Sequence, residues 1–393
     1  MVDFRNLGVC EQLCKVCKSI GFDKPTKIQV LSIPYSLNGK DIIACAQTGS
    51  GKTMAFSIPL LQNLLFCKKF LSGLIVVPSR ELAFQIASQF EMLGGLFGVK
   101  VAVLVGGIDF YTQVEMIKSQ PHFIISTPGR LIEHLEKYNH LSLKKTKKIV
   151  FDEADRLLQF DFEKESNIII SGLPVDRQFY FFSATMTTSL ERLQKANVKN
   201  PIKIIVNKKY KSVTNLQQHY IFSPFILKEC YLLYICNEFY GSSIIIFVES
   251  QKSAEKLMLI LNFLGFDAKA LHGGLKQVKR LEILNKFKLK DCKILLATDV
   301  ASRGLDIIGV DLIVNYNIPI YAKNYLHRIG RTARNGRSGR AINLVSQYEI
   351  RSFQKIEKMT GLTIREFFCQ SIKIEAIEKI LSEAKFKLKN FGD

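Results

Sequence analysis

The stretch DIIACAQTGSGKTMAFSIPLLQNLL, residues 41–65, places a glycine-rich loop between an apolar strand and a helix. Backbone N–H groups of such a loop, together with the helix N-terminus, can cradle the phosphates of a nucleotide. Lys52 would reach the β- and γ-phosphates, and the Thr53 hydroxyl would bind Mg²⁺. Ala46 stands where the general pattern has its first glycine, so a chance glycine-rich turn is the alternative. The flanking strand and helix favour a nucleotide site formed by Ala46, Gln47, Thr48, Gly49, Ser50, Gly51, Lys52 and Thr53.

A second motif, VFDEAD at residues 150–155, supplies the carboxylates that a phosphate loop requires. Asp152 ends an apolar run, which is the position of a Mg²⁺-holding aspartate in nucleotide hydrolases. Glu153 can reach a water that faces the γ-phosphate and orient it or take its proton. Acidic clusters are usually solvated turns, but the apolar run and the phosphate loop upstream favour a catalytic role here.

Composition limits the class of protein and its partners. The length of 393 residues suggests two or three domains, and 47% hydrophobic with 23% charged residues exclude disorder, collagen and coiled coil. A formal charge of +20 predicts a polyanionic partner, either nucleic acid or an anionic membrane face. The membrane is disfavoured because no apolar run approaches the roughly 18 residues of a spanning helix. The lack of a secretory signal and the scattered, odd-numbered cysteines favour a reducing intracellular compartment.

Short apolar runs alternate with longer helical stretches along the whole chain. Near-continuous apolar strands separated by helices predict parallel sheets that are covered on both faces, so we expect an α/β fold twice over. The predicted domains are residues 1–206 and 217–370, with a linker at 207–216 and a C-terminal helical extension at 371–393. The lysine-rich stretch 195–217 is either a solvated loop or an RNA-facing segment. The expected strands are 41–46, 73–78, 100–105, 122–126, 148–152, 178–183, 243–248, 267–271, 293–298, 311–316 and 341–346.

Polar motifs follow many of these strands, at the edge where open α/β sheets bind ligands. The second half has no phosphate loop of its own. Its segment HRIGRTAR, residues 327–334, is expected to place His327, Arg331 and Arg334 on one face of a helix. Arginines opposite a γ-phosphate would act as arginine fingers, and the alternative is a solvated basic helix.

Over nearly its whole length the chain resembles the DEAD-box ATP-dependent RNA helicases of superfamily 2, whose motifs occur here in order. A resemblance carried by eleven ordered motifs is specific, and it implies two tandem RecA-like domains, each a mostly parallel sheet flanked by helices. The motifs are GFDKPTKIQ (21–29) with Phe4 upstream, AQTGSGKT (46–53), PSRELA (78–83), Gly106-Gly107, TPGR (127–130), DEAD (152–155), SAT (183–185), IIIFVES (244–250), HGGLKQVKR (272–280), ATDVASRGLD (297–306) and HRIGRTAR (327–334). Ser79 replaces the usual threonine of PTRELA, and the IIIFVES motif differs from its commonest wording.

The resemblance implies a role for each matching residue. Gln29 would read the adenine edge and Phe4 would stack on the ring. Asp306, Arg331 and Arg334 would contact the nucleotide from the second domain. Ser183, Thr185 and His327 would couple hydrolysis to domain movement. RNA backbone would lie across Pro78, Arg80, Gly107, Thr127, Gly129, Arg130, Gln277, Arg280 and Thr298.

The implied activity is RNA-stimulated ATP hydrolysis coupled to local unwinding of short duplexes or remodelling of RNA–protein complexes. Backbone contacts carry little sequence information, so RNA recognition should be largely independent of base sequence. GGIDFYTQ, PHFIISTPGRLIEHL and DEADRLL resemble the nucleolar members that serve small-subunit ribosome assembly. This favours ribosomal RNA processing in the nucleus or nucleolus over the cytoplasm, by a monomer that a protein activator or ribosome-assembly factors can assist.

Other interpretations remain open at this stage. The motifs equally suit an ATP-gated RNA clamp with slow product release. A DNA helicase is disfavoured by the GFDKPTKIQ and DEAD wording, and a kinase or transport ATPase by the second domain. Cys10, Cys14 and Cys17 invite a metal site, but helical spacing and the lack of a matching Cys/His pair predict buried core.

Overall fold

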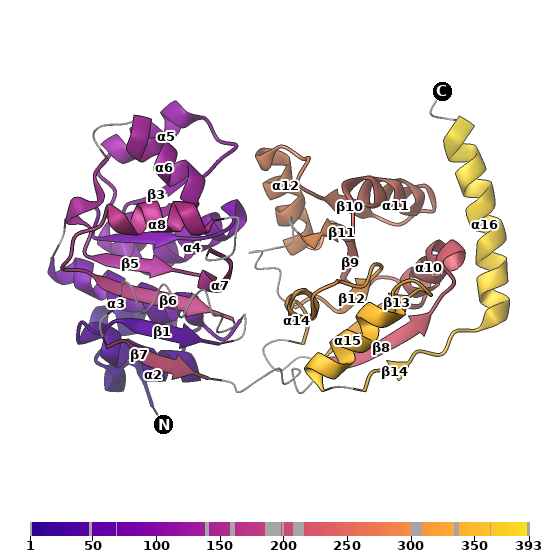
Figure 1. The fold of residues 1–393 in the computed structure, drawn as a ribbon, viewed down its shortest axis with the longest axis horizontal. Helices are drawn as coiled ribbons and strands as arrows, with labels where there is room; N and C mark the ends of the chain where they lie inside the picture. The colour runs from indigo at the N-terminus through magenta and orange to yellow at the C-terminus, as the bar shows by residue number, and fades with distance from the viewer. Residues whose placement is uncertain are drawn as a thin grey trace. The chain divides into compact units, whose positions relative to one another are not determined.

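A computed structural model describes residues 2–46, 49–67, 69–137, 141–157, 162–184, 198, 200–206, 216–299, 309–333, 338–361 and 363–390. The chain divides into two compact units, Met1–Lys208 and Lys209–Asp393, and each is built around a parallel sheet (Figure 1). The α/β prediction of two tandem parallel sheets flanked by helices is therefore confirmed. Most of the predicted linker, residues 207–215, lies outside the described residues. Among those described, no helix is both long and apolar enough to cross a membrane.

The first unit carries a seven-stranded sheet in the order β3-β4-β2-β5-β6-β1-β7. Its strands are β1 (Ile42–Cys45), β2 (Gly73–Val76), β3 (Val101–Leu104), β4 (Phe123–Ser126), β5 (Lys148–Phe151), β6 (Gln178–Ser183) and β7 (Ile202–Ile205). Its helices are η1 (Phe4–Leu7), α1 (Glu11–Ser19), α2 (Lys27–Leu37), α3 (Lys52–Phe66), α4 (Arg80–Gly94), η2 (Gly95–Phe97), α5 (Phe110–Lys118), α6 (Pro128–Lys137), η3 (Leu143–Lys145), α7 (Ala154–Leu157) and α8 (Glu163–Ser171).

The second unit carries a seven-stranded sheet in the order β10-β11-β9-β12-β13-β8-β14. Counted along the chain within each unit, this order is the same as that of the first sheet, so the two units share one topology. Its strands are β8 (Leu216–Phe222), β9 (Ile244–Val248), β10 (Ala268–Leu271), β11 (Ile294–Thr298), β12 (Leu312–Asn315), β13 (Gly339–Val345) and β14 (Arg365–Glu366). Its helices are η4 (Phe225–Leu227), α10 (Lys228–Glu238), α11 (Gln251–Phe263), α12 (Gln277–Lys288), α14 (Ala322–Ile329), α15 (Ile350–Thr360) and α16 (Ser371–Asn390).

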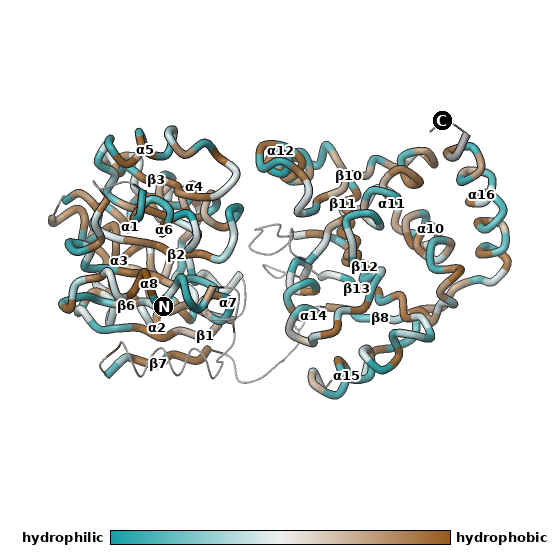
Figure 2. Tube along the Cα trace, turned by 45° about the horizontal axis from the view of Figure 1, so that its top comes forward, coloured by the Kyte–Doolittle hydropathy of each residue, from teal (hydrophilic) through white to brown (hydrophobic). Residues whose placement is uncertain are grey.

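Alternate residues of each central strand enter different cores. In β1, Ile42 and Ala44 pack into the core that α3 and α4 cover, whereas Ile43 packs into the core that α6, α7 and α8 cover. In β9, Ile244 packs beneath α10 and α11, and Ile245 packs on the opposite face with α12 and α14. A strand with both faces buried needs an apolar side chain at every position. Hydrophobic residues accordingly dominate the central strands (Figure 2).

Every strand expected from the sequence is present, with bounds shifted by no more than two residues. The strands β7, β8 and β14 were not expected, and they extend the sheets beyond β1 and β13. Strands at or next to a sheet edge are covered less completely, so β7 and β8 mix buried with exposed residues and lack a continuous apolar run. The predicted C-terminal helix is α16, which packs on α10 and α11.

The buried side chain of His134 packs α6 against α5. His134 is 0% exposed, and its ring stacks on Phe110 with the centroids 4.3 Å apart. Neither ring nitrogen has a hydrogen-bond partner among the residues that the structure describes. Burial, with a smaller contribution from Arg130, lowers the pKa of His134 to about 4. The ring is therefore neutral in the native protein at physiological pH.

We expect His134→Phe to reduce the loss of stability at acidic pH. Unfolding lets His134 take up a proton, so stability falls as pH drops from the ordinary pKa of 6.5 towards about 4. Phenylalanine keeps the ring stack and cannot be protonated. Urea midpoints of wild type and variant should diverge between about pH 7 and about pH 5, with the variant losing less. A parallel loss in both proteins would contradict a neutral, buried His134.

Candidate functional site

The strand order sorts the motifs of the first unit into two groups along one edge. All paired strands run parallel, so their carboxyl ends meet at that edge. The phosphate loop, DEAD and SAT follow β1, β5 and β6, which are neighbours. PSRELA, Gly106-Gly107 and TPGR follow β2, β3 and β4, which form the other half of the sheet. The expected nucleotide residues and the expected RNA residues thus occupy adjacent halves of one edge.

The phosphate loop has the backbone of an anion cradle. Gly49 and Gly51 have φ values of +80° and +91°, in the left-handed region that favours glycine. Lys52 begins α3, is 9% exposed, and donates a hydrogen bond from Nζ to the Ala46 carbonyl at 2.7 Å. The Ser50 hydroxyl is buried and has no hydrogen-bond partner among the described residues. These features fit a phosphate group; Gln47 and Thr48 lie outside the described residues.

Gln29 connects the start of α2 to the phosphate loop. Its Oε1 accepts a hydrogen bond from the Thr26 amide at 2.8 Å, and its Nε2 donates one to the Gly51 carbonyl at 3.0 Å. A Cβ atom at Gly51 would lie 2.5 Å from that Nε2, so only glycine fits beneath the amide. The upstream Phe4 is 2% exposed and belongs to the hydrophobic core. Its stacking on adenine stays a prediction.

The two carboxylates that follow β5 have different surroundings. Asp152 is 4% exposed, and its Oδ1 accepts a hydrogen bond from the Glu153 amide at 2.9 Å. Burial raises the pKa of Asp152 to about 6, although Lys52 opposes the rise. A buried carboxylate with this environment gains from a cation, which fits the predicted Mg²⁺ ligand. Thr53, the other predicted ligand, follows Lys52 in the first turn of α3.

Glu153 is held in a strained backbone position. Its φ of +50° is uncommon for a residue with a side chain, and its Oε2 lies 2.9 Å from Nη1 of Arg156. Such outliers concentrate at functional sites, where the surrounding structure holds them in place. The ion pair with Arg156 thus fixes the orientation of the Glu153 carboxylate, which is predicted to orient the attacking water.

Ser183 ends β6 directly beside the phosphate loop. It pairs in register with Cys45, and its carbonyl accepts a hydrogen bond from the Ala46 amide at 3.0 Å. The first residue of SAT therefore touches the first residue of the phosphate loop. Thr185 lies outside the described residues.

The other half of the edge groups the predicted RNA contacts. The Arg80 guanidinium lies against Gly106, where an added Cβ would be 3.1 Å from Nη2. Gly107 has a φ of +81°, and Arg130 donates from Nη2 to the Ile108 carbonyl at 3.0 Å. The remaining predicted contacts lie at the same strand ends: Pro78 is half-buried before α4, Thr127 is half-buried before α6, and Gly129 is exposed in the first turn of α6. Arg130 is thus already engaged in holding the Gly107 loop.

In the second unit, the predicted RNA residues again follow neighbouring strands. Gln277 begins α12 after β10, and its Oε1 accepts a hydrogen bond from Nη1 of Arg280 at 3.5 Å. Both side chains are more than nine-tenths buried. Thr298 ends β11, which lies between β10 and β9. The topology therefore brings these residues to the carboxyl edge of the second sheet.

The expectation that His327, Arg331 and Arg334 share one helix face is wrong. Helix α14 ends at Ile329 with Gly330 as its cap, so Arg331 lies beyond it. Thr332 then forms a bridge with Val310, just before β12 begins. The segment accordingly turns towards the amino ends of the strands, whereas the predicted RNA residues lie at the carboxyl ends. Arg331 is 5% exposed, and Arg334 and Asp306 lie outside the described residues.

The sequence did not predict that a buried arginine of HRIGRTAR bonds to the ATDVASRGLD motif. Arg328 is 4% exposed and binds Asp299 through two hydrogen bonds, Nε to Oδ1 at 2.6 Å and Nη2 to Oδ2 at 2.9 Å. It also donates to Asn315 Oδ1 and to the Asn317 carbonyl. Arg328 thereby ties HRIGRTAR to the residue after Thr298. Its motif was visible in the sequence, but spacing alone cannot show that an arginine is buried against a carboxylate.

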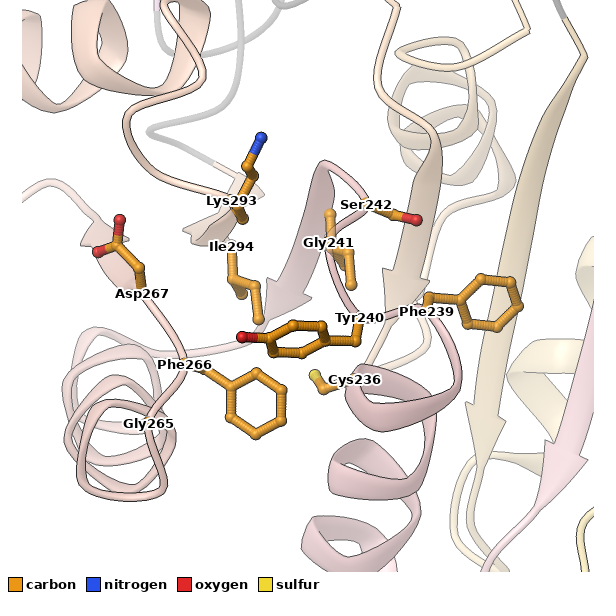
Figure 3. A pocket seen from close by; sticks show the side chains of 11 residues that line it. Cys236, Phe239, Tyr240, Gly241, Ser242, Gly265, Phe266, Asp267, Lys293 and Ile294 are labelled. Atoms are coloured by element: carbon orange, nitrogen blue, oxygen red, sulfur yellow. The ribbon is translucent and has the colours of Figure 1, made fainter.

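Two other features lie outside the site. Cys17 is fully buried, and Cys10 and Cys14 pack against the same core, which supports the core interpretation. A hollow of about 280 Å³ lies at the amino ends of β9, β10 and β11 (Figure 3). Tyr240 and Phe266 line it, and none of the predicted site residues does.

Comparison with known proteins identifies the family. The DEAD/DEAH box helicase family model matches residues 26–193, and the Helicase conserved C-terminal domain model matches residues 226–336. The chain is 50% identical over 382 residues to the probable ATP-dependent RNA helicase DDX47 of Homo sapiens, covering 97% of this chain and 84% of that protein. It is 45% identical to the ATP-dependent rRNA helicase RRP3 of Coccidioides immitis, covering 97% of this chain and 81% of that protein.

Solved structures of the same kind match across both units. The DEAD-box helicase Mss116 bound to ssRNA and UDP-BeF matches with a TM-score of 0.89 and 29% identity over 98% of this chain and 83% of that chain. S. cerevisiae Dbp5 bound to RNA and ADP BeF3 matches with a TM-score of 0.84 and 28% identity over 97% of this chain and 99% of that chain. Sequence, topology and motif geometry agree, and the chain belongs to the DEAD-box family of ATP-dependent RNA helicases.

Proposed function

We propose that this helicase acts on ribosomal RNA in the nucleus or nucleolus, as a monomer that ribosome-assembly proteins can activate. The likeness to the rRNA helicase RRP3 and to DDX47 supports this choice of substrate. The observation that best supports the proposed activity is the order of the strands in the first sheet, which divides the motifs at their carboxyl ends into two groups. That arrangement sets a phosphate loop and its carboxylates beside a separate group of RNA-contacting loops.

The nucleotide half of the first unit carries a lysine and carboxylates suited to ATP hydrolysis. Mg²⁺, which would screen the phosphate charge, would be held by Asp152 and the Thr53 hydroxyl. Lys52 exchanges its hydrogen bond to Ala46 for the β- and γ-phosphates. Glu153, fixed by Arg156, orients the attacking water and accepts its proton. The family resemblance assigns the γ-phosphate charge in the transition state to Arg331 and Arg334, which would stabilise it.

The adenine side of the site communicates with the phosphate side through Gln29. Reading the adenine edge requires the Gln29 amide, which in this structure is bonded to Thr26 and Gly51. Adenine binding at Gln29 therefore changes the restraint on the loop that holds the phosphates. Ser183 extends the same loop contact to SAT through its carbonyl bond to Ala46.

RNA would bind residues at the carboxyl ends of the strands in both units, through its own phosphate–sugar backbone. Arg80, Gly107, Thr127, Gly129, Arg130 and Pro78 in the first unit, with Gln277, Arg280 and Thr298 in the second, would contact phosphates and sugars. Backbone amides and arginine guanidinium groups suit phosphate oxygens. Contact with a 2′-hydroxyl would distinguish RNA from DNA.

Lys52→Ala should abolish RNA-stimulated ATP turnover, with a loss of about 10²–10³-fold or more, because the phosphates lose their buried cation. The measurement is ATPase rate without nucleic acid, with single-stranded RNA and with matched single-stranded DNA. Lys164→Ala, at an exposed lysine of α8, is the control and should retain stimulation by RNA alone. A normal rate of ATP turnover in Lys52→Ala would contradict the assignment of residues 46–53 as the phosphate loop.

Glu153→Gln should slow hydrolysis by about 10²–10⁴-fold while nucleotide binding persists, because the amide cannot accept the proton from water. The variant should hold labelled RNA in an ATP-dependent complex, measured by fluorescence anisotropy with and without ATP. RNA retention that is indifferent to ATP would count against a water-activating role for Glu153.

RNA affinity should fall with salt at a slope of about −0.7 per phosphate neutralised. Arg80→Ala removes one guanidinium from the RNA half and should reduce that slope by about 0.7, with Lys164→Ala unchanged. Binding of a single-stranded RNA across a series of KCl concentrations gives both slopes. A slope that is flat, or equal in the two variants, would reject Arg80 as a phosphate contact.

A further inference from the structure

The second unit contains a counterpart of the phosphate loop that has become apolar. In both units the same strand position, β1 or β8, leads through a short loop into a helix. Each helix begins with a buried lysine, Lys52 in α3 and Lys228 in α10. The loop in the second unit reads Ser-Pro-Phe-Ile-Leu at residues 223–227 and contains no glycine.

This loop is not built to receive phosphate. The Ser223 amide donates to the Val345 carbonyl at 2.9 Å, and the Phe225 amide donates to Gln347 Oε1 at 3.1 Å. The Leu227 amide donates to the Pro224 carbonyl, and Pro224 has no N–H to offer. Three amides of this loop are thus used within the protein, and a fourth position has no N–H group.

The positive charge of Lys228 is also paired within the protein, by a glutamate. Nζ of Lys228 lies 2.7 Å from Glu349 Oε2, and Lys228 is 1% exposed. Glu349 also accepts hydrogen bonds from the Ser346 hydroxyl at 2.6 Å and from the Ile318 amide at 3.0 Å. This cluster fixes the loops that follow β8, β13 and β12, which are neighbours in the sheet.

These fixed loops display large apolar side chains to solvent. We call the set the apolar platform: Phe225 (57% exposed), Ile226 (86%), Ile320 (68%), Tyr321 (68%) and Tyr348 (77%). The rings of Phe225 and Tyr348 are in edge contact, with centroids 5.8 Å apart. Clustered exposed apolar side chains on a rigid support mark interaction surfaces. The predicted RNA residues of this unit follow β10 and β11, in the other half of the sheet.

The charges beside the platform indicate the chemistry of its partner. Helix α15 follows Tyr348 directly and exposes Arg351, Lys355 and Lys358. Glu249, at the end of β9, is exposed on the opposite border. A second copy of this chain would bring another charge of +20 to the contact, which opposes self-association. Aliphatic Ile226 and Ile320 offer RNA neither stacking nor hydrogen bonds, so a protein suits the surface better.

We propose that the apolar platform binds a protein segment that combines acidic residues with bulky apolar side chains. The apolar residues cover Ile226, Tyr348 and their neighbours, and the acidic residues pair with the exposed face of α15. Because the platform lies in the half of the edge without predicted RNA residues, such a partner and RNA can be bound by this unit together. The proposal does not depend on which RNA the helicase acts on.

The test is selection from a displayed library of short random peptides on the full-length chain. The double variant Ile226→Ser with Tyr348→Ser provides counter-selection, and Leu259→Ser, at an exposed leucine of α11, is the matched control. Peptides that prefer wild type should be rich in Asp, Glu, Leu, Ile and Phe. Synthetic copies should bind the double variant about tenfold or more weakly, and Leu259→Ser as tightly as wild type.

Several outcomes would overturn the proposal. Failure to enrich any peptide that distinguishes wild type from the double variant would remove the docking site. Enrichment of basic or purely polar peptides would reject the stated chemistry. Loss of single-stranded RNA binding in the double variant, or loss of a concentration-dependent dimer in sedimentation, would reassign the platform to RNA or to a second copy. RNA-stimulated ATPase and thermal unfolding show that the double variant is folded, and both should match wild type.

Discussion

Parallel strand pairing is the constraint on which the site depends. Because the strands are parallel, their carboxyl ends all lie at the same edge of the sheet. The order β3-β4-β2-β5-β6-β1-β7 then decides which motifs become neighbours at that edge. Phosphate loop, DEAD and SAT are widely separated in the sequence, yet β1, β6 and β5 lie side by side. The RNA motifs are grouped by the same rule. The expected nucleotide residues and the expected RNA residues therefore lie at one sheet edge, each group on its own half.

Buried charge gives that edge its chemistry. Lys52 and Asp152 are both nearly inaccessible to solvent: Lys52 donates a hydrogen bond to a backbone carbonyl, and burial raises the pKa of Asp152. Groups that are desolvated before the ligand arrives interact with it more strongly than groups in water. Gln29 and Ser183 contact the same loop from different elements, so the loop is restrained from both sides.

The two units share one topology but use it differently. In the first, the loop after the equivalent strand keeps its glycines and a lysine with a replaceable backbone partner. In the second, Lys228 is locked to Glu349, and the loop residues Phe225 and Ile226 face solvent. The predicted RNA residues of the second unit follow β10 and β11, in the other half of its sheet edge. Its arginine segment turns towards the amino ends of the strands instead.

The sequence by itself determined the fold class, the central strands and the motif residues, because apolar periodicity and motif spacing are local. It did not determine where α14 ends, since Gly330 and the bridge of Thr332 to Val310 override the helical spacing of the arginines. It also missed Arg328 with Asp299, and the bond of Gln29 to Gly51. Those partners are distant in sequence, and only the packing of strands and helices decides which buried polar groups meet.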